Sequence, residues 1–309
     1  MKRLLIVSTI FFAIGTLLFQ SCKKEPTEPP KVGIFYSIVD KKVAFTALTI
    51  RVVSWKWDFG DGETSIERDP VHTYGGGGYY SVKLTGTDAE GRSEVAYDTL
   101  AVAVTPYVLL TGGSGAAGGK TWKLTSTHSS KDKLANADAD LSPVDGAPFP
   151  LPNGVFGMIG MSEVYDDTYT FFYDGRYSHD VKADHAAFAG LVFEYLTTGG
   201  AGIVNSGGSD FGLCTGSYTP EQGATFTYVE KEDFTVPSVY GQDGALTFSE
   251  ASTLDFSGTE FVGFMDNQRK VIIQDITDNS MRLVMFMAAS PDYYPLNTNA
   301  LVLTFEVVK

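Results

Sequence analysis

The stretch Trp55-Lys56-Trp57-Asp58-Phe59 most constrains the fold of this 309-residue chain, because aromatic and charged residues alternate in it strictly. A period of two is the side-chain period of a β-strand, so Trp55, Trp57 and Phe59 share one face and the charged residues the other. Gly60-Asp61-Gly62 follows at once and supplies a sharp reversal. We therefore expect a strand with one buried aromatic face, followed by a turn, in a β-sheet domain.

A second pair of segments extends this pattern downstream. Asp69-Pro70-Val71-His72-Thr73-Tyr74 leads into the alternating stretch Tyr80 to Thr85. Together with the Trp-Asp-Phe-Gly-Asp-Gly string, these segments resemble the PKD domain, an immunoglobulin-like β-sandwich common in bacterial surface proteins, over residues 31–105. The resemblance implies a spacer or stalk. For Trp57, packing in the sandwich core is favoured over a role as a sugar platform, since an aromatic residue flanked by polar alternates normally faces inward.

The first thirty residues read as an export and anchoring signal. A basic Met1-Lys2-Arg3 precedes the uncharged apolar run Leu4 to Phe19, which is too short and too early for a membrane span. Gln20-Ser21-Cys22 then resembles the lipobox of bacterial lipoproteins, which implies a signal peptide over residues 1–21 and lipidation of Cys22. An ordinary secretory signal with an incidental Cys22 is the alternative. Residues 22–30, with three prolines, predict an extended lipid-anchored tether.

Charge and cysteine content narrow the class of protein further. The formal charge is −14, and loss of Lys2 and Arg3 with the signal peptide makes it −16, which disfavours nucleic acid as a partner. Cys214 is the second of two cysteines, so acylation of Cys22 leaves no internal disulfide and the fold must depend on its apolar core. With no neighbouring histidine or cysteine in the sequence, Cys214 is expected to be a buried, inert thiol.

Residues 106–119 are rich in glycine and predict a flexible linker or domain entry. A phosphate-cradling loop is disfavoured, because Trp122-Lys123-Leu124 continues as a strand and not as a helix. Residues 120–309 then form the second domain. In it, Asp174-Gly175 joins two alternating stretches into a predicted hairpin, and Thr277-Asp278-Asn279-Ser280 joins another pair.

One helix is predicted in this second domain. Asp184 can cap a segment whose apolar residues recur at offsets of three, four, seven and eight, and Gly190 weakens it. The face consists of Phe188, Leu191, Val192, Tyr195 and Leu196. The remaining glycine-rich stretches, such as Thr198 to Gly208, are expected to be surface loops that can carry function.

The layout of the second domain resembles the C-terminal domains of PKD-bearing surface glycan-binding lipoproteins of the starch-utilisation type. The resemblance rests on a Gly-Lys-Thr-Trp strand, an Asp-Asp-Thr-Tyr-Thr-Phe strand and a closing Ile-Thr-Asp-Asn hairpin. It implies an outer-membrane lipoprotein on the cell surface that binds polysaccharide or oligosaccharide and delivers it to an outer-membrane transporter. The expected fold is all-β, with a larger, jelly-roll-like β-sandwich after the PKD domain. A closed lipocalin-like barrel is the alternative.

Motifs for catalysis are missing from the sequence. The Glu-x-Asp-x-x-Glu strand motif of one large class of β-sandwich glycosidases does not occur, and Glu163–Asp167 and Glu230–Asp233 lack its spacing. His128, His179 and His185 are not accompanied by a Gly-x-Ser-x-Gly elbow. We predict no enzymatic activity, and a non-typical glycoside hydrolase stays as an alternative.

Asp138, Asp140 and Asp145 lie in one loop with Gly146 and offer the oxygen ligands that calcium prefers. Their spacing is not that of an EF-hand, and no glutamate closes the loop. These three residues are therefore weak metal candidates, a polar loop is favoured, and no other cofactor is expected.

A carbohydrate site requires an exposed aromatic face for the sugar's C–H groups and polar side chains for its hydroxyls. Adjacent Tyr293 and Tyr294 cannot both face inward in an extended segment, so at least one is expected to be exposed. Trp122 is a further candidate, although core packing explains it equally well. The predicted ligand-binding residues are Tyr293, Tyr294, Tyr240, Asp292, Gln242, Asn297 and Trp122.

A second function of a different class is an adhesion or scaffolding lipoprotein whose distal domain binds protein. An exposed tyrosine cleft would favour glycan binding, whereas a broad apolar patch would favour protein binding.

Overall fold

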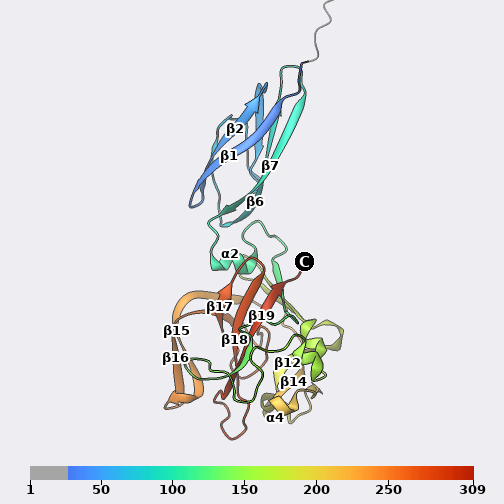
Figure 1. Ribbon diagram of the computed structural model, residues 1–309, viewed down its shortest axis with the longest axis vertical. Helices are drawn as coiled ribbons and strands as arrows, with labels where there is room; N and C mark the ends of the chain where they lie inside the picture. The colour runs from blue at the N-terminus through green and yellow to red at the C-terminus, as the bar shows by residue number, and fades with distance from the viewer. Residues whose placement is uncertain (1–26) are drawn as a thin grey trace, which may run out of the picture.

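The computed structural model describes residues 27–309. The predicted signal peptide, Cys22 and the start of the tether therefore lie outside the described residues. Two β-rich units follow each other along the chain, joined by the short helix α2 (Pro106–Thr111) (Figure 1). The expected all-β class with an immunoglobulin-like N-terminal domain is confirmed. Within residues 27–309, the helices are all too short or too polar to span a bilayer.

The N-terminal domain is a sandwich of two antiparallel sheets. One sheet has the order β1-β2-β5 and the other β4-β3-β6-β7. The strands are β1 (Lys31–Val39), β2 (Lys42–Ile50), β3 (Ser54–Asp58), β4 (Thr64–Ser65), β5 (Val71–Thr73), β6 (Gly78–Thr87) and β7 (Ser93–Val102).

The aromatic strand faces inward as the alternation predicts. Trp57 is fully buried, packs 5.1 Å from the Phe45 ring, and donates its indole N–H to the Glu67 carbonyl at 3.1 Å. His72 stacks on Phe59 at 4.2 Å, and its Nε2 lies 2.7 Å from a carboxylate oxygen of Asp61 in the Gly-Asp-Gly turn. Trp57 therefore fills the core, and His72 holds the turn.

The segment predicted to be a flexible linker begins instead with an ordered helix. The Thr105 hydroxyl accepts a hydrogen bond from the Val108 N–H at the start of α2, and Gly112, in the left-handed conformation, ends it. Leu110 of this helix is fully buried in the core of the second domain, where its carbonyl accepts the indole N–H of Trp122 at 2.9 Å. The apolar side chains of α2 explain the difference, because burying them orders the backbone that the neighbouring glycines would leave free.

The second domain is built on one antiparallel sheet that closes on itself. Its strands follow the order β11-β10-β8-β19-β18-β17-β16-β15, and a bridge between Arg176 and Thr225 joins the two ends. The Tyr177 N–H donates to the Ala224 carbonyl at 2.9 Å beside that bridge. This is the lipocalin-like barrel that the sequence left open as an alternative. The strands are β8 (Lys120–Leu124), β10 (Thr168–Phe171), β11 (Tyr177–Asp180), β15 (Phe226–Gln242), β16 (Ala245–Phe256), β17 (Val271–Ile276), β18 (Ser280–Met287) and β19 (Asn299–Val307), with β9 (Lys133–Asn136) pairing beside β19.

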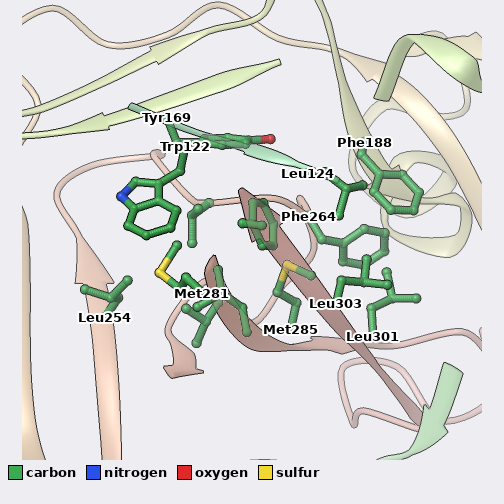
Figure 2. Close-up of a cluster of buried hydrophobic side chains, with 14 of the residues drawn as sticks. Trp122, Leu124, Tyr169, Phe188, Leu254, Phe264, Met281, Met285, Leu301 and Leu303 are labelled. Carbon is green, nitrogen blue, oxygen red and sulfur yellow. The ribbon is translucent and has the colours of Figure 1, made fainter. Parts of the chain in front are cut away.

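Side chains from opposite walls fill the interior of this barrel. Trp122 and Tyr169 lie on one side and Leu254 and Met281 on the other, within a single buried cluster (Figure 2). Trp122 therefore belongs to the core, which corrects its place among the ligand-binding candidates. The two predicted hairpins appear as β10–β11 and β17–β18.

The β15–β16 hairpin adds a second layer outside the barrel. Its distal half brings Phe234 and Phe248 to 6.4 and 5.5 Å from the Phe286 ring, on the outer face of β18. Strands β17 to β19 thus have both faces buried, which gives this side of the domain the character of a sandwich.

A small sheet packs against the barrel and corrects the helix prediction. Residues 186–190 form a strand that pairs with β14, and the helix α4 begins only at Leu191. All five residues of that strand are buried, so both of its faces are covered and tertiary packing overrides the helical spacing. Cys214 is buried, as expected. The elements here are β12 (Ala186–Gly190), α4 (Leu191–Thr198), β13 (Ile203–Asn205), η3 (Ser209–Phe211) and β14 (Leu213–Ser217), and the short helices α3 (Val155–Met158), η1 (Ser162–Tyr165) and η2 (Lys182–Asp184) precede them.

Truncation of Leu110 tests the role of α2. Leu110→Ala should lower the free energy of unfolding of the second domain by about 3 kcal/mol, because it leaves a cavity in that domain's core. Urea denaturation followed by fluorescence measures this in a Trp55→Phe, Trp57→Phe background, where Trp122 is the remaining tryptophan. The matched change Leu109→Ala, at a half-buried neighbour, should cost less than half as much; equal losses would show that α2 is not a core element.

Candidate functional site

An open cleft of about 550 Å³ lies where β9, η3, α4 and the start of β19 meet. Asn299 begins β19, whose other end pairs with β8 beside α2, so the cleft lies at the end of the barrel remote from the N-terminal domain (Figure 1). Its lining combines apolar and polar side chains. The lining residues are Leu134, Val144, Asp145, Gly146, Ala147, Leu191, Val192, Ser209, Asp210, Phe211, Gly212, Ala289 and Asn299.

Phe211 supplies an aromatic face in this cleft. It ends the short turn η3, and 46% of its surface is exposed. Gly212 follows at φ 73°, a left-handed conformation that favours glycine, and the Leu213 N–H returns to the Gly208 carbonyl at 3.0 Å. This tight turn holds the ring at the surface, where it can stack against the C–H face of a sugar.

Polar side chains surround the ring. Asp145 and Asp210 are the charged residues in the lining, and both are exposed. The amide of Asn299 is held in place, because its Nδ2 donates to the Ala135 carbonyl at 3.4 Å and its Oδ1 accepts from Thr298 at 2.8 Å. Carboxylate oxygens accept hydrogen bonds from hydroxyls, so this lining suits a neutral polyhydroxylated ligand.

The three aspartates proposed as metal ligands are not gathered into a cation site. Hydrogen bonds from the Ser142 N–H, at 2.9 Å, and from the Ser142 hydroxyl engage the Asp138 carboxylate. Burial alone would raise the pKa of Asp138, but these hydrogen bonds outweigh it and lower the pKa. Asp145 points to the cleft instead. Across residues 27–309, no three acidic, histidine or cysteine side chains are grouped to hold a metal ion.

Tyr240 lies beside the cleft wall. Its hydroxyl donates to Oδ1 of Asn136 at 3.1 Å, and Asn136 faces Asn299 directly across the β9–β19 pairing. Because opposite residues of an antiparallel pair point to the same side, Tyr240 continues the surface that Asn299 begins. Its ring is 51% exposed.

The Tyr293–Tyr294 segment follows four positions after Ala289, which lines the cleft. Tyr293 is 55% exposed and Tyr294 is half-buried. The loop is fixed to the end of β15 by Asn297, which is buried and donates its amide to the Pro237 carbonyl at 2.7 Å.

The structure thus sorts the predicted ligand-binding residues into three groups. Trp122 lies in the barrel core and Asn297 anchors a loop. Both corrections have the same cause, because each side chain is buried and donates its N–H inside the protein. Asp292 and Gln242 are exposed. Asp292 lies in the loop that carries Tyr293, whereas Tyr240 and Gln242 lie at the end of β15 and not in the predicted loop. The structure joins the end of β15 to the loop that carries Tyr293, because the Val239 N–H donates to the Asn297 carbonyl at 3.1 Å.

Sequence reasoning missed Phe211, Asp210 and Asn299. The string Ser209-Asp210-Phe211-Gly212 does carry a signal, since a lone aromatic residue in a short polar turn between glycines is expected to be exposed. The approach of this turn to β9 and β19 has no local signal, because the segments are far apart in the chain.

A buried polar network holds one wall of this region in place. The Asp132 carboxylate accepts from Nδ1 of His128 at 2.9 Å, from the Ser129 hydroxyl, and from the N–H and hydroxyl of Thr304 at 3.1 and 2.6 Å. Nε2 of His128 lies 3.0 Å from the Tyr165 hydroxyl. These contacts fasten the segment around α3 and η1 to β19. Burial would raise the pKa of Asp132, but the hydrogen bonds outweigh it and lower the pKa.

Asp132→Asn should therefore destabilise the second domain by about 3 kcal/mol at pH 7. The folded-state pKa of Asp132 is depressed, so its stabilisation is present above the ordinary carboxyl pKa and is lost as pH falls through the folded value. Urea unfolding between pH 3 and pH 7 should show a steeper acid loss for the natural chain than for the variant. Asp140→Asn, in an exposed position, should leave both curves unchanged; a matching effect there would rule out the network as the cause.

Comparison with known proteins identifies the N-terminal domain. The model of the family described as PKD domain matches residues 39–104. Residues 39–104 form a PKD domain. A microbial collagenase of Vibrio alginolyticus is 48% identical over 52 residues, which is 17% of this chain and 6% of the collagenase. The PKD1 domain of the Vibrio cholerae metalloprotease PrtV is 32% identical, with a TM-score of 0.24, and covers 25% of this chain and 100% of that domain.

The chain therefore spans a small fraction of the curated relatives that it matches. A solved structure concerned with the promiscuous specificity of carbohydrate-binding modules from the β-sandwich superfamily covers 92% of this chain and 94% of its own. Its identity is 16% and its TM-score 0.26, and similarity at that level says nothing about a ligand.

Proposed function

We propose that this protein is a surface lipoprotein whose barrel domain binds polysaccharide or oligosaccharide in the cleft at Phe211. The observation that carries the proposal is the lining of that cleft: an exposed ring beside two carboxylates and an oriented amide, in an open space of about 550 Å³. A volume in this range accommodates a saccharide of a few units, and stacking plus hydroxyl hydrogen bonds is the chemistry that binds one.

The order of the parts supports the same proposal. Residues 27–30 lead into β1, and the PKD domain precedes the barrel. The helix α4, which lines the cleft, lies at the end of the barrel away from α2 (Figure 1). Such an order places a binding surface away from the membrane, where a long polymer can reach it. Tyr240 and Tyr293 would extend the contact along the polymer beyond the cleft itself.

The carbohydrate-binding test uses the chain from Lys23 onward on native gels that contain β-glucans, α-glucans or mannans. One polysaccharide should retard the protein, and Phe211→Ala should weaken that retardation by about tenfold, because it removes the stacking surface. Tyr97→Ala is the matched control, since Tyr97 is an exposed aromatic residue of the PKD domain.

Three outcomes separate the possibilities. Retardation that depends on Phe211 and not on Tyr97 supports the cleft as the site. Retardation that survives Phe211→Ala but is lost in Tyr293→Ala keeps glycan binding and moves the site to the tyrosine loop. No retardation by any polysaccharide would count against glycan binding.

Protein adhesion is the second candidate, and one surface favours it. Phe35, Leu48 and Ile50 are all exposed on the outer face of the β1–β2 pair in the PKD domain. Loss of binding to a host or neighbouring cell after Phe35→Ser, with glycan retardation unchanged, would support this function.

The lipid anchor is part of the proposal and has its own test. Cys22→Ala should move the protein from the membrane fraction to the soluble fraction and abolish its labelling by radioactive palmitate, because lipidation requires the cysteine thiol. Protease treatment of intact cells then reports whether the natural protein is exposed outside. Unchanged membrane association of the variant would contradict the anchor, and with it delivery to an outer-membrane transporter.

A further inference from the structure

A second, smaller cavity opens beside the cleft. Its volume is about 70 Å³, and all ten residues that line it are apolar. Leu134, Ala147 and Phe211 line both spaces, so the cavity adjoins the cleft behind the Phe211 ring. The lining residues are Leu134, Ala147, Pro148, Leu151, Val155, Phe156, Ile159, Phe211, Leu213 and Leu301.

The inner walls of this cavity belong to the packed core. Phe156 and Leu213 are buried in the core cluster, and Leu301 belongs to β19. The α3 wall is held through the hydrogen bond from the Phe156 N–H to the Tyr165 hydroxyl, at 3.2 Å, which joins the Asp132 network. A cavity between such walls keeps its shape when it is empty and offers a ligand preformed apolar contact.

Size and polarity together restrict what can enter. An apolar cavity of about 150 Å³ holds benzene and stays free of water. A space of about 70 Å³ is roughly half as large and suits about three carbon atoms. Water gains no hydrogen bonds from an apolar lining, and a sugar ring is too large and too polar for the space.

The two spaces therefore fit two parts of one molecule. The cleft offers Asp145, Asp210 and Asn299 to a polar part, and the cavity offers aliphatic side chains to a small apolar part. We propose that the ligand is a saccharide bearing a short alkyl or acyl substituent of about three carbons, whose apolar end enters the cavity behind Phe211. This inference rests on the proposed glycan binding and specifies the class of glycan.

The experiment uses the chain from Lys23 onward with ¹³C-labelled leucine methyl groups and three probes. Methyl β-D-glucoside and n-propyl β-D-glucoside differ by two carbons, and 1-propanol lacks the sugar. We expect the propyl glucoside to bind about tenfold more tightly than the methyl glucoside, because two further methylene groups leave water. Propyl glucoside and propanol should shift the methyl resonances of Leu134, Leu213 and Leu301.

Ala147→Leu adds three carbons at the shared wall and should abolish both the propyl preference and the propanol shifts. Ala139→Leu, the same change at an exposed loop position, is the control and should alter neither. Thermal unfolding checks that each variant is folded. If Ala147→Leu does not fold, Ala147→Val fills less of the cavity and replaces it in the test.

The outcomes separate the two proposals. Equal binding of both glucosides, without shifts at the three leucines, would overturn the proposal that the ligand carries an apolar substituent. Glycan binding itself would stay supported. Propanol shifts that Ala147→Leu removes, with neither glucoside bound, would support the cavity as an aliphatic site while counting against glucose as the sugar. No shift with any probe that carries a propyl group overturns the inference.

Discussion

The contact between Trp122 and α2 is the interaction on which the two-domain arrangement depends. The indole N–H of Trp122 donates to the Leu110 carbonyl, and Leu110 itself is buried in the same core. Because the donor lies inside the barrel and the acceptor lies in the segment that leaves the PKD domain, folding of the barrel also orders the connection. The end of the barrel that carries the cleft is then held by an ordered connection and not by a loose chain.

The sequence predicts local features well and non-local ones poorly. Alternation places Trp57 in a sandwich core, and Asp174-Gly175 predicts the β10–β11 hairpin, because both depend on residues a few positions apart. The bridge from Arg176 to Thr225 that closes the barrel has no such signal. Residues 186–190 show the converse failure: their spacing fits a helix, but burial on both faces favours a strand.

The same distinction applies to the site. An exposed tyrosine could be anticipated at Tyr293, since adjacent residues of an extended segment face opposite ways. Asn297 looked equally available to a ligand in the sequence. In the structure its amide N–H instead joins its loop to Pro237 of β15. The cleft itself is assembled from segments that begin near residues 134, 191, 209 and 299. No window of the sequence contains it. The exposure of Phe211 had a local signal in its short polar turn, but its place beside β9 and β19 could be recognised only in the folded chain.

Under the proposed function, electrostatics restricts which saccharides this cleft can bind. Asp145 and Asp210 are the charged residues in its lining, and the whole chain carries a formal charge of −14. A uronate or sulfated polymer would bring further negative charge against two carboxylates and would be repelled, most strongly at low ionic strength. A neutral glycan loses nothing by this charge, because its hydroxyls can donate to both carboxylates. Under the proposed function, the acidic lining disfavours polyanionic saccharides before any contact with Phe211 is made.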